Sequence, residues 1–403
     1  MPDSATQVRD LHGGTPIWPR RPTQSEPLLE PIKADVVVLG AGVTGSMVAE
    51  ATTAAGLSTV VLDRRPPGFG STAASTALLQ FEIDTPLTQM VDEIGFESAR
   101  RAWLRSYAAI SGLEHMVRTL RIDCAFRNRT ALYLAGDELG PVQLADEARL
   151  RRRIGLPSLY LTGGELRAYA GIDRPAAVLS HGAADVDPVR LAAGCLDRAV
   201  ARGARLYAPV NVAEVAPRDR DVQLVTDAGI EVTARVLVFA TGYELADGVP
   251  SAGHRHTSTW AFATRPQVYN LWPQRDLIWE ASDPYLYIRT TEDGRVIVGG
   301  EDEQLDDERA RDAATASKVS VLQAKAKALL PAIDVAAAFA WSGTFGESDN
   351  GLPSIGRVPG MPNCYAVLGY GGNGITFSVV AAQIIQRLLC GHTDPDAGIF
   401  AFR

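Results

Sequence analysis

Residues 35–45 read DVVVLGAGVTG, and this stretch decides the fold. A short continuous apolar run ending in glycine is typical of a strand buried on both faces of a parallel sheet. A helix over 43–56 and a second buried strand over 58–62 are expected next, which completes a βαβ unit. The G-x-G-x-x-G pattern inside it predicts that a dinucleotide pyrophosphate binds at the helix N-terminus. The candidate residues are Gly40, Gly42, Val43, Thr44 and Gly45.

Asp63 stands at the end of the second strand, where a carboxylate can accept hydrogen bonds from a ribose diol. It would repel a 2′-phosphate, although Arg64 and Arg65 beside it leave that open. The residues alone allow NAD or FAD. The following loop, GFGSTAASTALL at 68–79, favours FAD because small hydroxylated residues let a long extended ligand approach closely. Its candidate contacts are Ser71, Thr72 and Ser75.

The composition excludes several classes of protein. A chain of 403 residues, 46% apolar and 21% charged, predicts two or three globular domains. The net charge of −8 and scattered basic residues make nucleic acid a poor partner. The four cysteines lack metal-ligand spacing, so no metal site or disulfide framework is expected. Since no stretch has the apolar length of a signal peptide or membrane span, we expect a cytoplasmic protein.

The rest of the chain predicts an α/β fold with two sheets. A helix over 188–203 leads into strands, the last of which ends at Thr241-Gly242. Residues 258–300 alternate and are rich in aromatics, which is typical of antiparallel strands. The C-terminal part resembles the first βαβ unit in its sequence pattern: a buried strand at 364–368, a glycine loop and a helix over 375–389. We therefore expect a discontinuous Rossmann-like FAD-binding domain with an inserted α+β substrate domain on an antiparallel sheet. The expected divisions are an N-terminal arm (1–31), the FAD-binding domain (32–118, 181–253 and 340–403) and the substrate domain (119–180 and 254–339).

Six segments carry a family resemblance: VVVLGAGVTG with Asp63, GSTAAS, GAADVDPVRL, ARVLVFATG, YLYIRTTEDGRVIVGGED and WSGTFGESDNGLPSIGRVPGMPNCYAVLGYGGNGITFS. Over about 32–391 the chain resembles the FAD-dependent family of D-amino-acid oxidase, glycine oxidase and sarcosine oxidase. The resemblance implies that FAD is the cofactor and that the backbone of Val212 holds its adenine. It also implies that the loop 371–376 lies under the pyrimidine edge of the flavin, where N–H groups at a helix start stabilise negative charge. The implied further contacts are Thr241, Gly242, Gly343, Gly372, Asn373, Gly374, Ile375 and Thr376.

Three departures from the family pattern qualify this expectation. Ser342 replaces the cysteine that bonds to flavin in sarcosine-oxidase-like members, which implies noncovalent FAD. Ile297 replaces their oxygen-activating lysine, which puts fast oxidation by air in doubt. Phe345 replaces the arginine with which glycine oxidase clamps the substrate carboxylate.

The candidate substrate residues are polar or aromatic and belong to the second domain. The resemblance aligns Tyr285 with a tyrosine that faces the substrate in glycine oxidase, and strand alternation places Tyr287 on the same sheet face. The other interpretation is that both tyrosines pack against the sheet. Arg289 could hold a substrate anion or cap its strand, and His256 could act as a base or lie in a surface loop. The remaining candidates for the pocket are Phe345, Trp260, Trp279, Gln80 and Glu82, with packing in the core as the alternative for the tryptophans.

The expected reaction is oxidation of a C–N bond in an amine or amino-acid derivative, by hydride transfer to flavin N5, giving an imine that hydrolyses. The electron acceptor would be oxygen, a quinone or a dye. The alternatives are a D-amino-acid or glycine oxidase or dehydrogenase proper, a flavoprotein subunit of an electron-transferring complex, a nicotinamide-dependent dehydrogenase and a flavin-bound protein without turnover.

Overall fold

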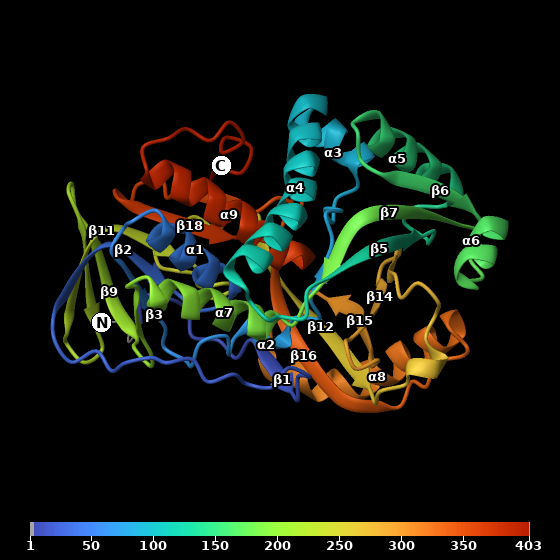
Figure 1. Cartoon of the computed structure of the whole chain (residues 1–403), viewed down its shortest axis with the longest axis horizontal. Coiled ribbons are helices and arrows are strands. Elements are labelled where there is room, and N and C mark those ends of the chain that lie inside the picture. Colours follow the sequence, from blue (N-terminus) through green and yellow to red (C-terminus); the bar gives the residue numbers. More distant parts are fainter. Residues whose placement is uncertain (1–3, 403) are drawn as a thin grey trace.

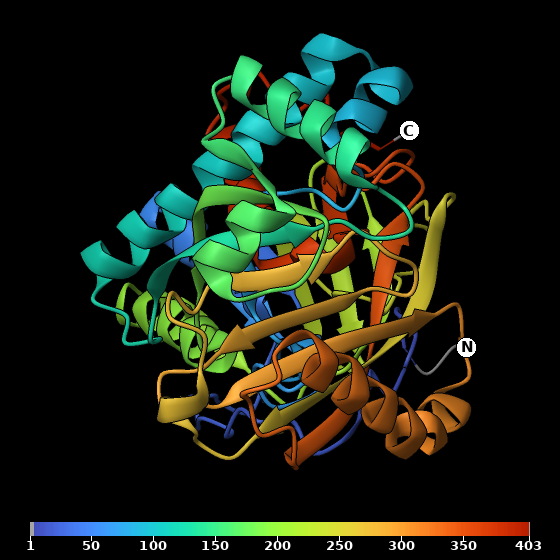
Figure 2. The ribbon, with the colours of Figure 1, turned by 90° about the vertical axis from the view of Figure 1, so that its right-hand side faces the viewer.

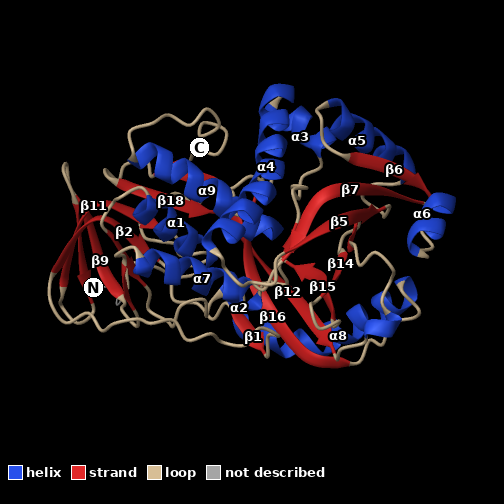
Figure 3. Ribbon diagram, viewed as in Figure 1, coloured by secondary structure: helices blue, strands red, loops and turns tan. Residues whose placement is uncertain are grey.

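The computed structural model describes residues 4–402, which form two sheets side by side (Figure 1). Helices cover the first sheet and flank the second (Figure 3). The helices are α1 Val43–Ala54, α2 Ser71–Ala74, α3 Leu87–Ile94, α4 Phe96–Leu120, α5 Pro141–Arg153, α6 Gly163–Ala170, α7 Pro188–Ala201, α8 Glu308–Leu329 and α9 Gly374–Leu389, with short 3-10 turns η1 Val268–Asn270 and η2 Gly371–Asn373.

The first sheet has a parallel centre in the order β18-β11-β2-β3-β8. Val36, Val37 and Val38 of β2 are fully buried, as expected of a strand covered on both faces. Helices α1, α7 and α9 pack together on one face. The strands of this sheet are β2 Ile32–Leu39, β3 Thr59–Leu62, β8 Arg205–Tyr207, β9 Val212–Pro217, β10 Val222–Thr226, β11 Glu231–Phe239, β17 Ser354–Arg357 and β18 Cys364–Leu368.

The second sheet is antiparallel except where β13 pairs with β5. Helix α8 packs against β12, β15 and β16 and lies across the outside of this sheet (Figure 2). The strands are β1 His12–Gly14, β4 Leu78–Leu79, β5 Arg127–Leu134, β6 Ser158–Thr162, β7 Ala176–Asp185, β12 His254–Thr264, β13 Leu277–Glu280, β14 Leu286–Thr290, β15 Val296–Glu303 and β16 Ala337–Ser348.

This arrangement confirms the α/β fold class, with a parallel nucleotide-type sheet and a separate antiparallel sheet. Helix α7 begins as the sequence predicts, because the Asp187 carboxylate accepts hydrogen bonds from the N–H groups of Val189 and Arg190. Strands β7 and β16 of the second sheet run past the expected divisions at 181 and 340. Among residues 4–402, no helix is long and apolar enough to cross a membrane, and no group of His, Cys, Asp or Glu side chains could hold a metal ion.

Candidate active site

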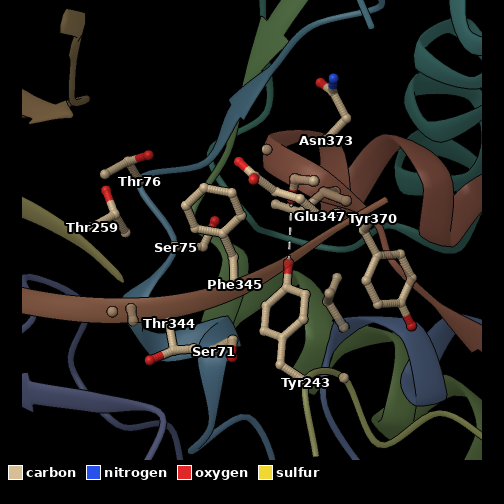
Figure 4. A pocket seen from close by; sticks show the side chains of 18 of the residues that line it. Ser71, Ser75, Thr76, Tyr243, Thr259, Thr344, Phe345, Glu347, Tyr370 and Asn373 are labelled. Carbon is tan, nitrogen blue, oxygen red and sulfur yellow. Dashed lines mark hydrogen bonds between the residues drawn. The ribbon is translucent and has the colours of Figure 1, made fainter. Parts of the chain in front are cut away.

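A cavity of about 520 Å³ lies between the two sheets and receives residues from both. Its floor is formed by the ends of β2, β3 and β11, and its roof by side chains of β12, β13, β14 and β16. Figure 4 shows Ser71, Ser75, Phe345 and Glu347 lying around this space. A cavity at the carboxyl ends of parallel strands is where open α/β sheets bind their ligands.

The glycine turn after β2 serves two purposes. A Cβ on Gly40 would overlap the Ala240 carbonyl, and one on Gly45 would overlap the Gly40 carbonyl, so packing requires glycine at both positions. A Cβ on Gly42 would meet only the Thr72 hydroxyl oxygen, at 3.1 Å. Gly42 lines the cavity, so its missing side chain leaves the backbone open to a ligand.

Asp63 and Arg64 line the cavity at the end of β3. The Asp63 carboxylate accepts hydrogen bonds from the Ala41 and Arg65 N–H groups, at 2.7 and 2.8 Å, which point it at the glycine turn. Burial raises its pKa, while these two N–H groups oppose that shift. A buried Nη1 of Arg64 has no hydrogen-bond partner, as expected of a cation placed for a polyanionic ligand.

The small-residue segment around α2 closes the turn from the side. The Thr72 hydroxyl accepts a hydrogen bond from the Val43 N–H at 3.0 Å. The backbone of Ala74 and Ser75 is held by the indole N–H groups of Trp341 and Trp18, at 2.8 and 2.6 Å. The Ser71 hydroxyl is buried without a partner in the cavity wall. Four groups in this wall together fit FAD: the backbone of the glycine turn, the unpaired hydroxyl of Ser71, the unpaired guanidinium nitrogen of Arg64 and the carboxylate of Asp63.

The glycine loop before α9 is tied to the segment that follows β4. The Gly372 N–H donates to the Asp84 carboxylate at 2.8 Å, and the Asn373 amide donates to the Glu82 carbonyl at 2.9 Å. The Thr376 hydroxyl donates to the Gln80 carbonyl at 2.9 Å. The loop therefore lines the cavity through its backbone, and the Gly372 N–H already has an acidic partner.

Eighteen of the predicted site residues line the cavity: Gly40, Gly42, Val43, Thr44, Asp63, Arg64, Ser71, Thr72, Ser75, Thr241, Gly242, Tyr285, Gly343, Phe345, Gly372, Asn373, Gly374 and Ile375. Five do not: Gly45, Val212, His256, Arg289 and Thr376. Gly45 and Thr376 still support the turn and the loop, as described above. The other three have partners elsewhere.

Arg289 is 2% exposed and donates to the carbonyls of Ala77 and Val186, at 2.5 and 3.0 Å. It joins chain segments instead of facing a substrate, so its position gives no support to a substrate clamp. Of the two alternatives for this residue, the structural one fits the geometry. The tryptophans also differ: Trp279 lines the cavity and stacks on Tyr133 at 3.7 Å, whereas Trp260 lies in the core.

His256 lies on β12 with both ring nitrogens engaged. One bonds to the Tyr243 carbonyl at 3.1 Å and the other to the Arg9 guanidinium at 3.0 Å. The carbonyl of Val212 accepts the Ala5 N–H at 2.8 Å. Both residues therefore contact the N-terminal arm.

Sequence reasoning did not single out a group of carboxyls at the loop end of the cavity. Asp84 and Glu347 line it, and Asp302 lies close to the hydroxyls of Thr259 and Tyr285. Burial raises the pKa of Asp84 to about 6 and that of Asp302 to about 7, and repulsion from Glu347 adds to both shifts. Asp84 lines the cavity, and its side chain is exposed to that space. Its position in the sequence could have revealed it, because it continues the two-residue spacing of Gln80 and Glu82.

Among the described residues, the cations in the cavity wall are Arg64 and Arg65. Both lie beside Asp63, at the end of the cavity away from the glycine loop before α9. Around the glycine loop the wall offers carboxyls, the hydroxyls of Tyr285 and Tyr287 and the ring of Phe345. Burial and the nearby Asp302 raise the pKa of both tyrosines, which keeps them protonated hydrogen-bond donors. This end suits a cation or a neutral amine better than a carboxylate.

Comparisons with known proteins agree with this geometry. The model of the FAD dependent oxidoreductase (DAO) family matches residues 35–388. The γ-glutamylputrescine oxidoreductase of Escherichia coli strain K12 is 25% identical over 376 residues, which cover 91% of this chain and 86% of that protein. The structure of glycine oxidase from Geobacillus kaustophilus superposes with a TM-score of 0.77 at 22% identity, covering 92% and 98% of the two chains.

L-proline dehydrogenase from P. horikoshii has the same fold, with a TM-score of 0.75 at 16% identity, covering 92% of this chain and 97% of that one. The family model spans most of the sequence and the cavity residues fit its cofactor. The chain belongs to the family of FAD-dependent oxidoreductases.

Proposed function

We propose that this enzyme oxidises the C–N bond of an amine that binds without an arginine clamp for a carboxylate. FAD, when bound, supplies the acceptor for the two electrons removed from the substrate. The product is an imine, and water hydrolyses it to a carbonyl compound and a smaller amine or ammonia. The protein's task is to bind the amine, orient its C–N bond and exclude bulk water.

The observation that carries this proposal is the charge of the cavity wall near the glycine loop. Asp84 and Glu347 stand there, and Arg289, the arginine nearest in sequence to the tyrosines, is engaged with backbone carbonyls. A free amino acid would bring its carboxylate next to these acids without a guanidinium to pair it. An amine cation reaching the same place would gain from them.

Tyr285 and Tyr287 supply directional contacts in the roof. Their ring centroids lie 5.7 Å apart, and both side chains line the cavity. Since their pKa values are raised, each hydroxyl can donate a hydrogen bond to a neutral amine nitrogen. Phe345 and Trp279 provide apolar surface against the substrate's carbon chain.

The curated relative in Escherichia coli supports an amine as the substrate class, because its name refers to an N-acylated diamine. The solved neighbours include enzymes named for amino acids, which makes amino-acid oxidation the competing proposal.

An anaerobic screen separates these proposals. The purified holoenzyme is mixed with matched pairs of amines and amino acids, such as ethylamine with alanine and putrescine with ornithine, and loss of the flavin absorbance is followed. We expect the amine of each pair to reduce the flavin faster. Faster reduction by glycine or an alanine enantiomer than by every amine would replace this proposal with amino-acid oxidation.

A further inference from the structure

The segment from Ser4 to Gly14, here called the proximal arm, lies outside the family match, which begins at residue 35. In Figure 1 the blue N-terminal trace runs from the first sheet along the lower side of the molecule to β1. There β1 pairs with β16 of the second sheet. The proximal arm therefore bridges the two sheets whose cleft forms the cavity.

The first part of the proximal arm is bonded to the FAD-binding side. The Ala5 N–H donates to the Val212 carbonyl at 2.8 Å, and the Ala5 carbonyl accepts the Asp247 N–H at 3.0 Å. The Gln7 N–H donates to the Leu245 carbonyl at 2.9 Å. Backbone bonds on both sides of Ala5, together with an isolated antiparallel bridge between Thr6 and Ala246, hold this stretch against the FAD-binding side.

The middle of the proximal arm crosses the end of β3. The Arg9 N–H donates to Glu244 at 2.8 Å, and the Arg9 carbonyl accepts from the Arg65 guanidinium at 3.1 Å. Arg65 also forms an ion pair with Glu244. Arg65 directly follows Asp63 and Arg64. The arm therefore passes over the Asp63 carboxylate, which is the group expected to bind the ribose.

The last part is bonded to the second sheet. The Leu11 carbonyl accepts the Thr344 N–H at 2.9 Å, and the Asp10 carbonyl accepts from the Arg311 guanidinium at 2.8 Å. The Arg9 side chain pairs with Asp306 on the same side of the cleft. Each half of the arm thus belongs to a different wall of the cavity.

Two side chains of the proximal arm point inward. Thr6 and Leu11 are 5% and 4% exposed, and both line the cavity together with Asp63 and Arg64. Val8 between them is 72% exposed. The arm is therefore part of the cavity wall at the end that carries the dinucleotide-type residues.

We propose that the proximal arm is a cofactor clamp, which closes the cleft over the adenosine half of FAD and slows its release. The clamp holds because it is bonded to both walls, so FAD can leave through this side only after one set of bonds opens. The closed arm is also expected to raise the affinity for FAD, because Thr6 and Leu11 complete the cavity wall only when the arm is in place. Thermodynamic linkage then requires bound FAD to stabilise the closed arm by the same factor as the closed arm raises the affinity for FAD.

Two substitutions test the clamp. Ala5→Pro removes the N–H that bonds to Val212, and Leu11→Ala removes apolar surface from the cavity wall. Arg21→Ala is the control, because Arg21 lies beyond the proximal arm and forms an ion pair with Asp197 in which both side chains are exposed. Holoenzyme is diluted, and the rise of free-flavin fluorescence gives the FAD release rate. We expect Ala5→Pro to release FAD ~3- to 10-fold faster, as the loss of one backbone hydrogen bond allows, and the control to match the wild type.

Release at the wild-type rate from both variants, or slower release from Ala5→Pro, would overturn the clamp. A second measurement uses the wild-type protein alone, so it does not depend on the folding of a variant. Amide hydrogen exchange at Ala5, Gln7 and Arg9 should slow when FAD is added to apoprotein, because the linkage closes the arm. Equal exchange in the two forms would contradict the proposal.

Discussion

The carboxylate of Asp84 accepts the Gly372 N–H at 2.8 Å, so an acidic side chain stands at the loop that opens α9. Burial raises the pKa of this carboxyl to about 6. The charge at the loop end of the cavity therefore changes between pH 5 and 7.

This charge gives a pH prediction for substrate binding. As pH rises through 6, Asp84 becomes anionic and attracts a cationic amine. The ratio of wild-type to Asp84→Asn kcat/KM should therefore increase from pH 5 to pH 7.5, and taking the ratio cancels the ionisation of the amine itself. Steady-state assays with one amine at several pH values measure it. A pH-independent ratio would show that Asp84 does not contact the cation.

The same group predicts the sign of a stability change. The folded protein keeps the Asp84 proton between the unfolded pKa near 3.9 and about 6, so it binds more protons than the unfolded chain in that window. The contribution of Asp84 to the free energy of unfolding should therefore fall as pH rises through the window, so the stability of the wild type relative to Asp84→Asn should be lower at pH 7 than at pH 4.5. Thermal unfolding of both apoproteins at pH 4.5 and 7 tests this sign.

Replacement of Gly42 should abolish FAD binding. Its φ of −76° suits any residue, so Gly42→Val adds a side chain at the cavity surface without backbone strain. The ratio of flavin to protein absorbance should collapse while circular dichroism keeps its helical signal. Gly164→Ala, with open space around its Cβ position, is the control. A fully flavinated Gly42→Val protein would place the phosphates elsewhere.

FAD should be bound without a covalent bond. The Ser342 side chain is fully buried, and its hydroxyl donates to Asp312 at 2.7 Å instead of facing the cavity. Acid precipitation of the holoenzyme should leave the yellow colour in the supernatant. Colour that stays with the precipitated protein contradicts this expectation.

Reduced enzyme should react faster with a dye or quinone than with air. Ile297 stands where the resemblance places an oxygen-activating lysine, and it is fully buried beside Trp341 and Ala261. Stopped-flow mixing of the reduced enzyme with air-saturated buffer and with a quinone measures both rates. Re-oxidation by oxygen within the turnover time would make the protein an oxidase.

Tyr285 and Phe345 should determine substrate choice. Tyr285→Phe removes one neutral hydrogen bond, worth about 1 kcal/mol, and should lower kcat/KM for an amine by ~10-fold at most. Phe345→Arg places a cation beside Glu347 and should lower amine turnover further. Tyr269→Phe is a suitable control, since Tyr269 is 99% exposed. If kcat/KM is unchanged in both variants, the substrate does not contact Tyr285 or Phe345.

The βαβ unit and the glycine turn could be predicted because their signals are local: adjacent residues form the strand, the turn and the helix start. The role of Arg289 could not be predicted, since it binds the carbonyls of Ala77 and Val186. These residues precede Arg289 in the chain by 212 and 103 positions. His256 is a similar case, because its partner Arg9 lies 247 positions away. Such contacts follow from how the two sheets meet, which no single segment encodes.

The acidic group shows an intermediate case. Glu347 follows Phe345 by two residues on β16, and Asp84 follows Gln80 and Glu82 at the same spacing. On β16, strand alternation contained the information that Glu347 shares a face with Phe345. Gln80, Glu82 and Asp84 lie after the end of β4 and outside any strand, although all three line the cavity. What the sequence did not contain was that the two segments come together.

The pairing of β1 with β16 also affects the behaviour of the protein in solution. Strand β16 is twelve residues long, and β1 lies on its outer side as the last strand of the sheet. Without β1, part of the hydrogen-bonding edge of β16 would be open to pairing with a strand of another molecule. The three residues of β1, His12–Gly14, thus protect a long strand against self-association, and forms of the protein that lack these residues should be handled as aggregation-prone.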